Sequence, residues 1–154
     1  MVKAAPLHDI GKIAVPDSIL LKPGKLTPEE FSVMETHTSK GSEIIQKLLR
    51  DEADGSENLY LRHCYDICRY HHERWDGKGY PDKIAGESIP LSARIVSIVD
   101  VYDALVSRRT YKPAFAHTEA MKMISEDAES GKFDKRIVEA FYGSEDVFRK
   151  IYNI

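Results

Sequence analysis

The sequence predicts an all-α protein. Apolar residues recur at helical spacing along almost the whole chain of 154 residues, and no segment alternates apolar and polar residues for long enough to indicate a strand. Prolines and glycines gather in a few short stretches, as expected of turns that separate helices. A chain of this length is able to bury a substantial core, so we predict a single domain over residues 1–154.

The expected elements follow one another between recognisable breaks. Residues 1–13 have the pattern of the end of a helix that closes near Gly11, and residues 15–25 are a predicted loop with two prolines and one glycine. Beyond them, loops are predicted at residues 51–57 and 76–90. The predicted helices cover residues 27–35, a segment that begins near residue 39, residues 58–73, residues 92–107, and two segments that begin at residues 118 and 134.

Several helix starts carry local signals. Thr27 is a predicted N-cap, followed by Pro28 in the first turn and Glu30 at the capping-box position. Thr118 and Asp134 are predicted to cap the two last helices. The segment 92–107 is the most apolar, and we therefore expect it to be the central helix of a bundle.

Composition excludes some classes of function. The formal net charge of −3 gives no electrostatic basis for binding a nucleic acid polymer or an anionic membrane. The most apolar stretch, residues 89–106, is interrupted by Arg94, Asp100 and Asp103, so it is not a membrane span. No signal-peptide core follows the N-terminus, and we expect a cytoplasmic protein.

The densest functional signal is the run HHERWDGKGYP at residues 71–81. Adjacent imidazoles are costly to bury unless they have partners, and metal ions are their usual partners. Mixed imidazole and carboxylate ligation suits iron, manganese, zinc, cobalt or nickel better than calcium or magnesium. Two ions that share a bridging carboxylate, for which Asp9 is the natural candidate, would lower the pKa of a shared water and supply a hydroxide nucleophile. Six positions are candidate ligands: His8, Asp9, His37, His71, His72 and Asp100.

Other interpretations of the same residue types remain open. A single histidine at a helix end, such as His37, is more often a satisfied polar residue than a ligand, and His63 and His117 are expected at the surface. Cys64 and Cys68 stand four residues apart on one predicted helix face. They are either soft metal ligands or, as we favour, small thiols packed against the core, and a disulfide is not expected between them.

The flanking motifs resemble the HD-GYP subfamily of the HD metal-dependent phosphohydrolases. The matching pieces, in the order of that family, are LHDIGKIAVPD, KPGKLTPEE, METHTSKG, HHERWDGKGYP, IPLSARIVSIVDVYDAL, SRRTYKPAF and the weaker GKFDKRIVEAF. The resemblance implies an HD-domain helical bundle with an ordered GYP loop and two or three divalent metal ions, often iron or manganese. It also implies hydrolysis of cyclic di-GMP to linear pGpG or onward to GMP.

The resemblance further implies roles for individual residues. The six candidate ligands fall on the ligand positions of the family, with Asp9 bridging two ions. Lys12 falls on a lysine that contacts the scissile phosphate, where an ammonium offsets negative charge, and Asp103 on a residue near the attacking water or the substrate. Arg109 and Lys112 fall on basic positions that hold the phosphate or guanine of the dinucleotide. Arg94 fits the family pattern without a physical role that the sequence reveals.

The glycines and the proline of the loop DGKGYP are expected to set its backbone conformation. Gly77 and Gly79 allow positive φ, and Pro81 fixes the exit, so that Tyr80 is presented rigidly. The resemblance links Gly79, Tyr80 and Pro81 to the binding of diguanylate-cyclase (GGDEF) domains. A plain turn with a packed tyrosine is an equal alternative.

One departure from the family pattern affects the expected activity. Family members carry further glutamate or histidine ligands on a helix about two dozen residues before the His-Asp pair, whereas seven residues precede His8 here. We therefore expect a chain that lacks its first helix and an upstream receiver or sensor domain, and a homodimer is one way to cover the uncovered apolar surface. The predicted function is a cyclic di-GMP phosphodiesterase. The alternatives are a catalytically impaired signalling module that binds a partner through the GYP loop and, less favoured, a nucleotidase acting on mononucleotides.

Overall fold

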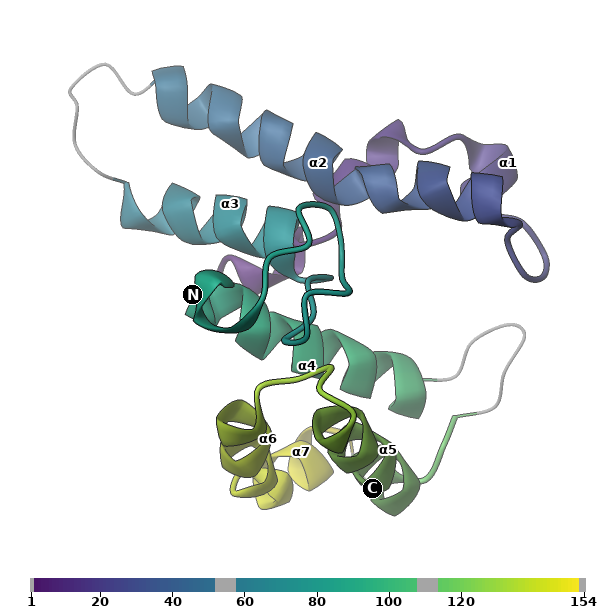
Figure 1. Cartoon of the computed structure of the whole chain (residues 1–154), viewed down its shortest axis with the longest axis vertical. Coiled ribbons are helices and arrows are strands. Elements are labelled where there is room, and N and C mark those ends of the chain that lie inside the picture. The colour runs from purple at the N-terminus through teal and green to yellow at the C-terminus, as the bar shows by residue number, and fades with distance from the viewer. Residues whose placement is uncertain (1, 52–57, 108–113, 153–154) are drawn as a thin grey trace.

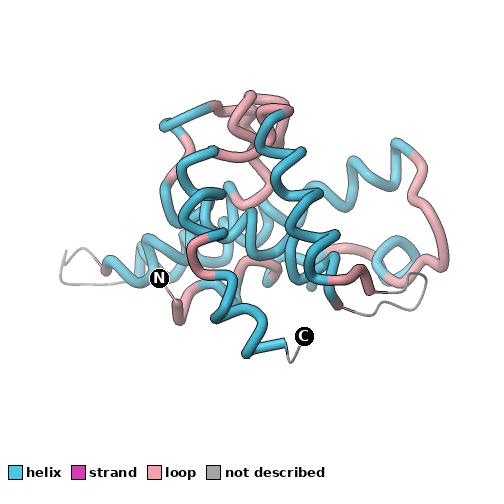
Figure 2. Tube along the Cα trace, turned by 90° about the horizontal axis from the view of Figure 1, so that it is seen from below, coloured by secondary structure: helices cyan, strands magenta, loops and turns pink. Residues whose placement is uncertain are grey.

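The structure is a computed structural model that describes residues 2–51, 58–107 and 114–152. Within these ranges the chain consists of helices joined by loops, with no strand (Figure 2). The all-α prediction is therefore confirmed. None of the helices in the same ranges combines the length and the apolar character needed to cross a membrane.

Seven α-helices and three short 3₁₀ helices make up the described part of the chain. Their bounds, in chain order, are η1 Ala5–Leu7, η2 Ile10–Ala14, α1 Asp17–Leu20, α2 Pro28–Asp51, α3 Leu59–Tyr70, η3 Gly86–Ser88, α4 Leu91–Val106, α5 His117–Glu129, α6 Lys135–Tyr142 and α7 Glu145–Tyr152.

The long helix α2 begins as predicted but does not end where it was expected to end. The Thr27 hydroxyl accepts a hydrogen bond from the Glu30 N–H at 3.3 Å, and the Glu30 carboxylate accepts one from the Thr27 N–H at 2.8 Å, which is a complete capping box. The predicted break before residue 39 is wrong. The hydroxyls of Thr36 and Thr38 donate to the backbone carbonyls three residues earlier, so this polar run is accommodated inside one continuous helix.

Three further local predictions are wrong. Residues 5–14 form two 3₁₀ turns rather than the end of an α-helix, and the predicted loop 15–25 contains the one-turn helix α1. Helix α5 starts at His117, so Thr118 is inside the helix rather than its cap. The predicted cap Asp134 is confirmed, because its carboxylate accepts the Arg136 N–H at 3.0 Å.

Two hydrophobic cores are built on opposite sides of α4. Figure 1 shows α2 and α3 side by side, α4 crossing below them, and α5, α6 and α7 gathered beyond α4. One core lies among η1, α2, α3 and α4, and the other among α4, α5, α6 and α7. Both cysteines are buried in the first core and unpaired, as we favoured from the sequence.

The loop between α3 and α4 is fastened to the C-terminal helices through Trp75. The backbone N–H of Trp75 donates to the backbone carbonyl of Lys132 at 2.9 Å. The guanidinium groups of Arg94 and Arg136 both lie over its ring, each 5.6 Å from the centroid, at cation–π distance. The buried carboxylate of Asp134 accepts hydrogen bonds from both arginines, at 2.7 Å from Arg94. The loop that carries the histidine pair is therefore held by α4 and α6 together.

Candidate metal centre

The structure gathers the predicted ligand positions into one cluster. Each of Asp9, His37, His71 and His72 offers a ligand atom, and these atoms all lie within 4.8 Å of one another. His8 adjoins them, with its Nε2 atom 3.2 Å from the Asp9 carboxylate and 3.6 Å from that of Asp100. The six residues come from the N-terminal 3₁₀ segment, α2, the end of α3 and α4, so the cluster depends on the packing of all four.

Backbone hydrogen bonds orient three of the imidazoles. The Nδ1 atoms of His8, His37 and His71 lie 2.7 to 2.9 Å from the backbone carbonyls of Ala5, Met34 and Ile67. A carbonyl only accepts, so Nδ1 must carry a proton in all three rings. In the neutral rings of His37 and His71 this leaves Nε2 with its lone pair. Such a second partner is the usual way in which a metal-binding histidine is fixed.

The Nε2 atoms meet in the interior of the cluster. Those of His37 and His71 are 3.5 Å apart, although both are acceptors in the tautomer that the backbone imposes. Two lone pairs that face each other at this distance repel unless a proton or a cation lies between them. The donor set therefore fits a metal ion.

Asp9 occupies the middle of the cluster with one carboxylate oxygen on each side. Its Oδ1 atom faces His37 at 3.4 Å and His71 at 3.9 Å, while Oδ2 faces His8 and the ammonium of Lys12. Oδ1 is buried and has no hydrogen-bond partner within the described residues. A buried acceptor without a partner is costly, and a cation beside the histidines would supply one.

Burial keeps the inner histidines neutral, which is the form that binds metal. Burial and the nearby charge of His8 lower the pKa of His71 to about 4. Burial also lowers the pKa of His72 and of His37.

The carboxylates of Asp9 and Asp100 have the opposite effect on His8, because they raise its pKa. Hydrogen bonds to Asp100 and Asp9 raise the pKa of His8 to about 10. Burial works against the charged form of Asp9, but the hydrogen bonds from His8 and Lys12 outweigh it and hold the pKa of Asp9 well below its usual range. The carboxylates of Asp9 and Asp100 and the cationic groups of His8 and Lys12 thus form one charge network beside the neutral histidines.

Glycine contacts allow the N-terminal segment to approach α2 this closely. An added Cβ at Gly11 would lie 1.9 Å from the carbonyl oxygen of His37 and 2.5 Å from the amide nitrogen of Gly41. Only glycine fits at this position, so Gly11 sets the distance between the His8–Asp9 pair and His37.

The residues predicted to act on the substrate lie around the cluster where they are described. Lys12 is ion-paired with Asp9 and is partly exposed. Asp103 is exposed and lines a cavity of about 560 Å³ together with His8 and Asp100. Arg109 and Lys112 lie outside the described residues.

The two glycines of the GYP loop have different backbone roles. Gly77 adopts a positive φ of 75°, which glycine allows, whereas Gly79 does not adopt positive φ. An added Cβ at Gly79 would instead lie 2.4 Å from the Arg74 nitrogen, so Gly79 is required for close packing of the loop on itself.

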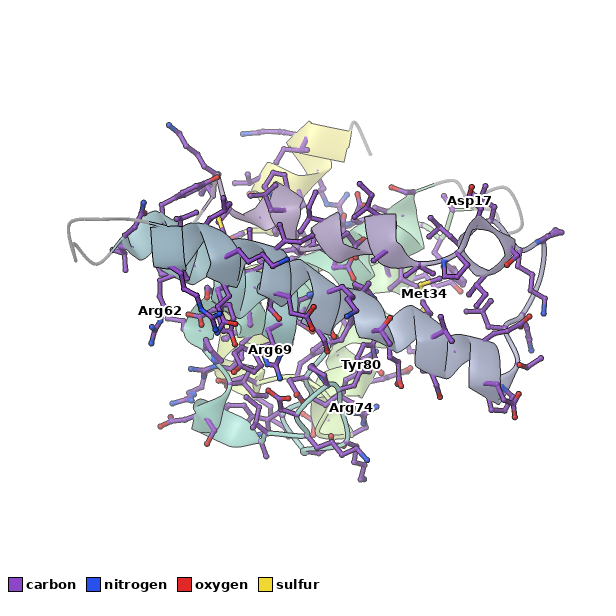
Figure 3. The ribbon with its side chains drawn as sticks, turned by 90° about the horizontal axis from the view of Figure 1, so that it is seen from above. Asp17, Met34, Arg62, Arg69, Arg74 and Tyr80 are labelled. Carbon is purple, nitrogen blue, oxygen red and sulfur yellow. The ribbon has the colours of Figure 1, made fainter. Side chains whose placement is uncertain are left out.

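Tyr80 is packed rather than presented to solvent. Its ring lies 4.8 Å from the ring of His72 and 6.1 Å from that of Phe31, and burial raises its pKa. Figure 3 shows Tyr80 and Arg74 on one side of α2 and Asp17 on the other. The packed tyrosine that the sequence left as an alternative is therefore observed, and the ring supports His72.

The two histidines expected at the surface are not equivalent. His117 is buried, which corrects the prediction. Its Nδ1 atom is 2.8 Å from the Tyr102 hydroxyl and its Nε2 atom 2.9 Å from the Glu145 carboxylate. These contacts join α4, α5 and α7. His63 is partly exposed on α3 and lies outside the metal cluster.

Sequence reasoning missed residues whose importance depends on packing. Arg94 had no role until the structure placed it between Trp75 and Asp134. Glu73 follows the histidine pair directly, yet its buried carboxylate anchors the loop by accepting the Asp82 N–H at 2.7 Å. Glu35 and Phe31 line a cavity beside His72. The feature of the sequence that could have revealed them is their spacing of four residues, which places both on one face of α2.

Comparisons with known proteins agree with this geometry. A sequence profile of the HD domain matches residues 1–137. A cyclic di-GMP phosphodiesterase of Vibrio cholerae is 49% identical over 148 residues, which are 96% of this chain and 29% of the relative. The cyclic di-GMP phosphodiesterase response regulator RpfG of Xanthomonas campestris is 49% identical over 138 residues, 89% of this chain and 34% of the relative.

A relative named for a different substrate is also similar. The 3′3′-cGAMP-specific phosphodiesterase 2 of Vibrio cholerae is 39% identical over 150 residues, 96% of this chain and 27% of the relative. The chain spans about a third of the length of the curated relatives it matches.

Proposed function

Since the chain belongs to the HD domain family, in its HD-GYP subfamily, we propose that it hydrolyses a phosphodiester bond of a cyclic dinucleotide, with cyclic di-GMP as the substrate. The observation that carries the proposal is the cluster of Asp9, His37, His71 and His72, with His8 and Asp100 beside it. The products are linear pGpG, GMP or both.

Two ions would be held by these residues, one by His37, His71, His72 and Asp9, and the other by His8, Asp9 and Asp100. Iron and manganese suit these imidazole and carboxylate donors, and a third ion would need donors beyond this set. When bound, such ions supply a water of lowered pKa and an electrophile for the phosphoryl oxygens.

The remaining residues act on the substrate. Lys12 lies beside Asp9, where its ammonium would face a non-bridging oxygen of the scissile phosphate. Asp103 lines the cavity that contains His8 and Asp100, from which its carboxylate would accept a proton or hold the incoming water. We assign Arg109 and Lys112 to the phosphates or bases of the substrate on the basis of the sequence motif alone.

The alternative function as a docking module is less well supported by the loop geometry. Gly79 is buried and the ring of Tyr80 is packed on His72, so the loop offers less aromatic surface to a partner than expected. Pro81 is partly exposed. Binding of a GGDEF domain through residues 79–81 and formation of a homodimer are therefore secondary proposals.

Metal loading and hydrolysis test the proposal in one experiment. We expect the protein loaded with Mn(II), or with Fe(II) under reducing conditions, to hydrolyse cyclic di-GMP, with the activity abolished in Asp9→Ala. A Glu43→Gln variant is the matched control, because Glu43 is exposed on α2 and, among the residues that the structure describes, pairs only with Lys40. Fewer than one bound ion per chain after loading would contradict the catalytic function. Loss of GGDEF binding in Tyr80→Ala but not in Asp9→Ala would favour the docking module.

A further inference from the structure

A cavity of about 350 Å³ opens beside the metal cluster on the side of the GYP loop. Its lining includes the candidate ligand His72, together with Phe31, Glu35, Tyr80 and Val101. These residues come from α2, the loop and α4, so the cavity lies where three elements meet. A group attached to a phosphate at the metal centre would therefore enter this cavity directly past His72.

Aromatic rings form one wall of this cavity. Phe31 is 47% exposed although it is a large apolar residue, and its ring meets that of Tyr80 edge-on at 6.1 Å between centroids. The Tyr80 ring in turn lies at 30° to that of His72. An exposed aromatic face such as that of Phe31 stacks on a nucleobase, which contributes about 1–3 kcal/mol for each base.

Glu35 is the lining carboxylate that has no other task. Among the described residues its carboxylate has neither a hydrogen-bond donor nor a cation within reach. The other charged groups around the cavity have partners: Arg74 and Lys78 pair with Asp76, and Lys132 pairs with Asp127. Glu73 accepts the Asp82 N–H through one oxygen, while its buried Oε2 has no hydrogen-bond partner among the described residues.

The chemistry of a free carboxylate selects among bases. Guanine presents two N–H groups side by side on its Watson–Crick edge, and a carboxylate provides two acceptor oxygens to receive them. Adenine presents one N–H donor beside a lone pair on the same edge, and this lone pair repels a carboxylate. Relatives of the chain include phosphodiesterases named for cyclic di-GMP and for 3′3′-cGAMP, so the sequence relationship leaves the base preference open.

We propose that this cavity is a base subsite selective for guanine, in which Glu35 accepts the N–H groups of the Watson–Crick edge and Phe31 and Tyr80 flank the ring. The inference rests on the proposed function in that the base belongs to a cyclic dinucleotide held at the metal centre. To that function the subsite adds a residue, Glu35, that decides which base is accepted.

The decisive variant is Glu35→Gln, measured on cyclic di-GMP and cyclic di-AMP. A glutamine side chain offers one donor and one acceptor, the pattern that matches adenine. We expect the ratio of kcat/KM for cyclic di-GMP over cyclic di-AMP to fall at least about tenfold relative to the wild type. Rates are normalised to those on bis(p-nitrophenyl) phosphate, which has no base, and Glu43→Gln is the control on the same helix.

A second measurement separates the subsite from catalysis. Calorimetric titration of the metal-loaded protein with GMP and with AMP compares the two bases while the phosphate contribution cancels. We expect tighter binding of GMP, with the preference lost in Glu35→Gln, and weaker binding of both nucleotides in Phe31→Ala.

The outcomes distinguish the two proposals. An unchanged substrate ratio and an unchanged GMP preference in Glu35→Gln would overturn the guanine subsite, even if cyclic di-GMP is hydrolysed. If the wild type hydrolyses no dinucleotide but binds GMP through Glu35, the subsite stands and the proposed hydrolysis fails.

Discussion

Replacing Gly11 by alanine should separate the N-terminal segment from α2 and disable the metal centre. The three atoms nearest to the added Cβ belong to the backbone of α2, namely the carbonyl group of His37 and the nitrogen of Gly41. A backbone atom inside a helix has no rotamer through which it could move aside. The whole segment that carries His8 and Asp9 must shift instead.

The size of the shift follows from the contact distances. The shortest contact must lengthen from 1.9 Å to at least 3.0 Å, a displacement of about 1.1 Å. Overpacking of this kind costs about 3 kcal/mol or more, which corresponds to a fall in Tm of about 6–12 °C for a chain of this length. A misplacement of about 1 Å in a catalytic constellation lowers the rate about a hundredfold.

The assay combines thermal unfolding, metal content after loading and hydrolysis of bis(p-nitrophenyl) phosphate. Gly143→Ala is the matched control, because its added Cβ would meet nothing closer than 3.4 Å at the end of α6. Its Tm should change by no more than about 2 °C. A Gly11→Ala protein with the Tm, metal content and activity of the wild type would refute the reasoning.

Three further predictions follow from the same structure. Removing bound ions with EDTA should lower the Tm, because an ion at one hundred times its Kd stabilises the native state by about 2.7 kcal/mol; an unchanged Tm would mean that the ligands do not hold an ion under those conditions. Asp134→Asn should destabilise the protein by about 3 kcal/mol in urea unfolding, because it leaves the buried Arg94 guanidinium without its partner. Burial opposes the charged form of Asp134, but hydrogen bonds from Arg136 and Arg94 outweigh it and lower its pKa. This stability is therefore present at neutral pH and is lost as the pH falls below about 4, so the difference between variant and wild type should shrink there. Tyr80→Ala should weaken metal binding by loosening His72, whereas Tyr80→Phe should not; equal loss in both variants would point to the hydroxyl instead of the ring.

Features with a local cause could be predicted from the sequence. The capping box of Thr27 and Glu30 and the cap at Asp134 involve residues two or three positions apart, so their spacing already specifies the hydrogen bonds. The six candidate ligand positions could also be selected from the sequence, because neighbouring imidazoles and carboxylates are costly to bury without a cation between them. The structure brings four of them, Asp9, His37, His71 and His72, into one cluster.

Features decided by packing could not be predicted in the same way. The run from Thr36 to Ser42 is polar and contains Gly41, which suggests a break. That glycine, however, is where Gly11 packs against α2, so tertiary contact maintains a helix that local propensity disfavours. His117 appeared isolated because its partner Glu145 lies 28 residues away, on a helix that was not predicted.

The position of α4 between two hydrophobic cores determines how the domain unfolds. Val96 belongs to the core shared with α3, while Ile98 and Tyr102 belong to the core shared with α5 and α6. Neither core is able to dissolve without exposing one side of the same helix, so the two halves lose their structure in a single cooperative step. Amide protons in the middle of α4, next to the candidate ligand Asp100, should consequently exchange with solvent only when the entire domain opens.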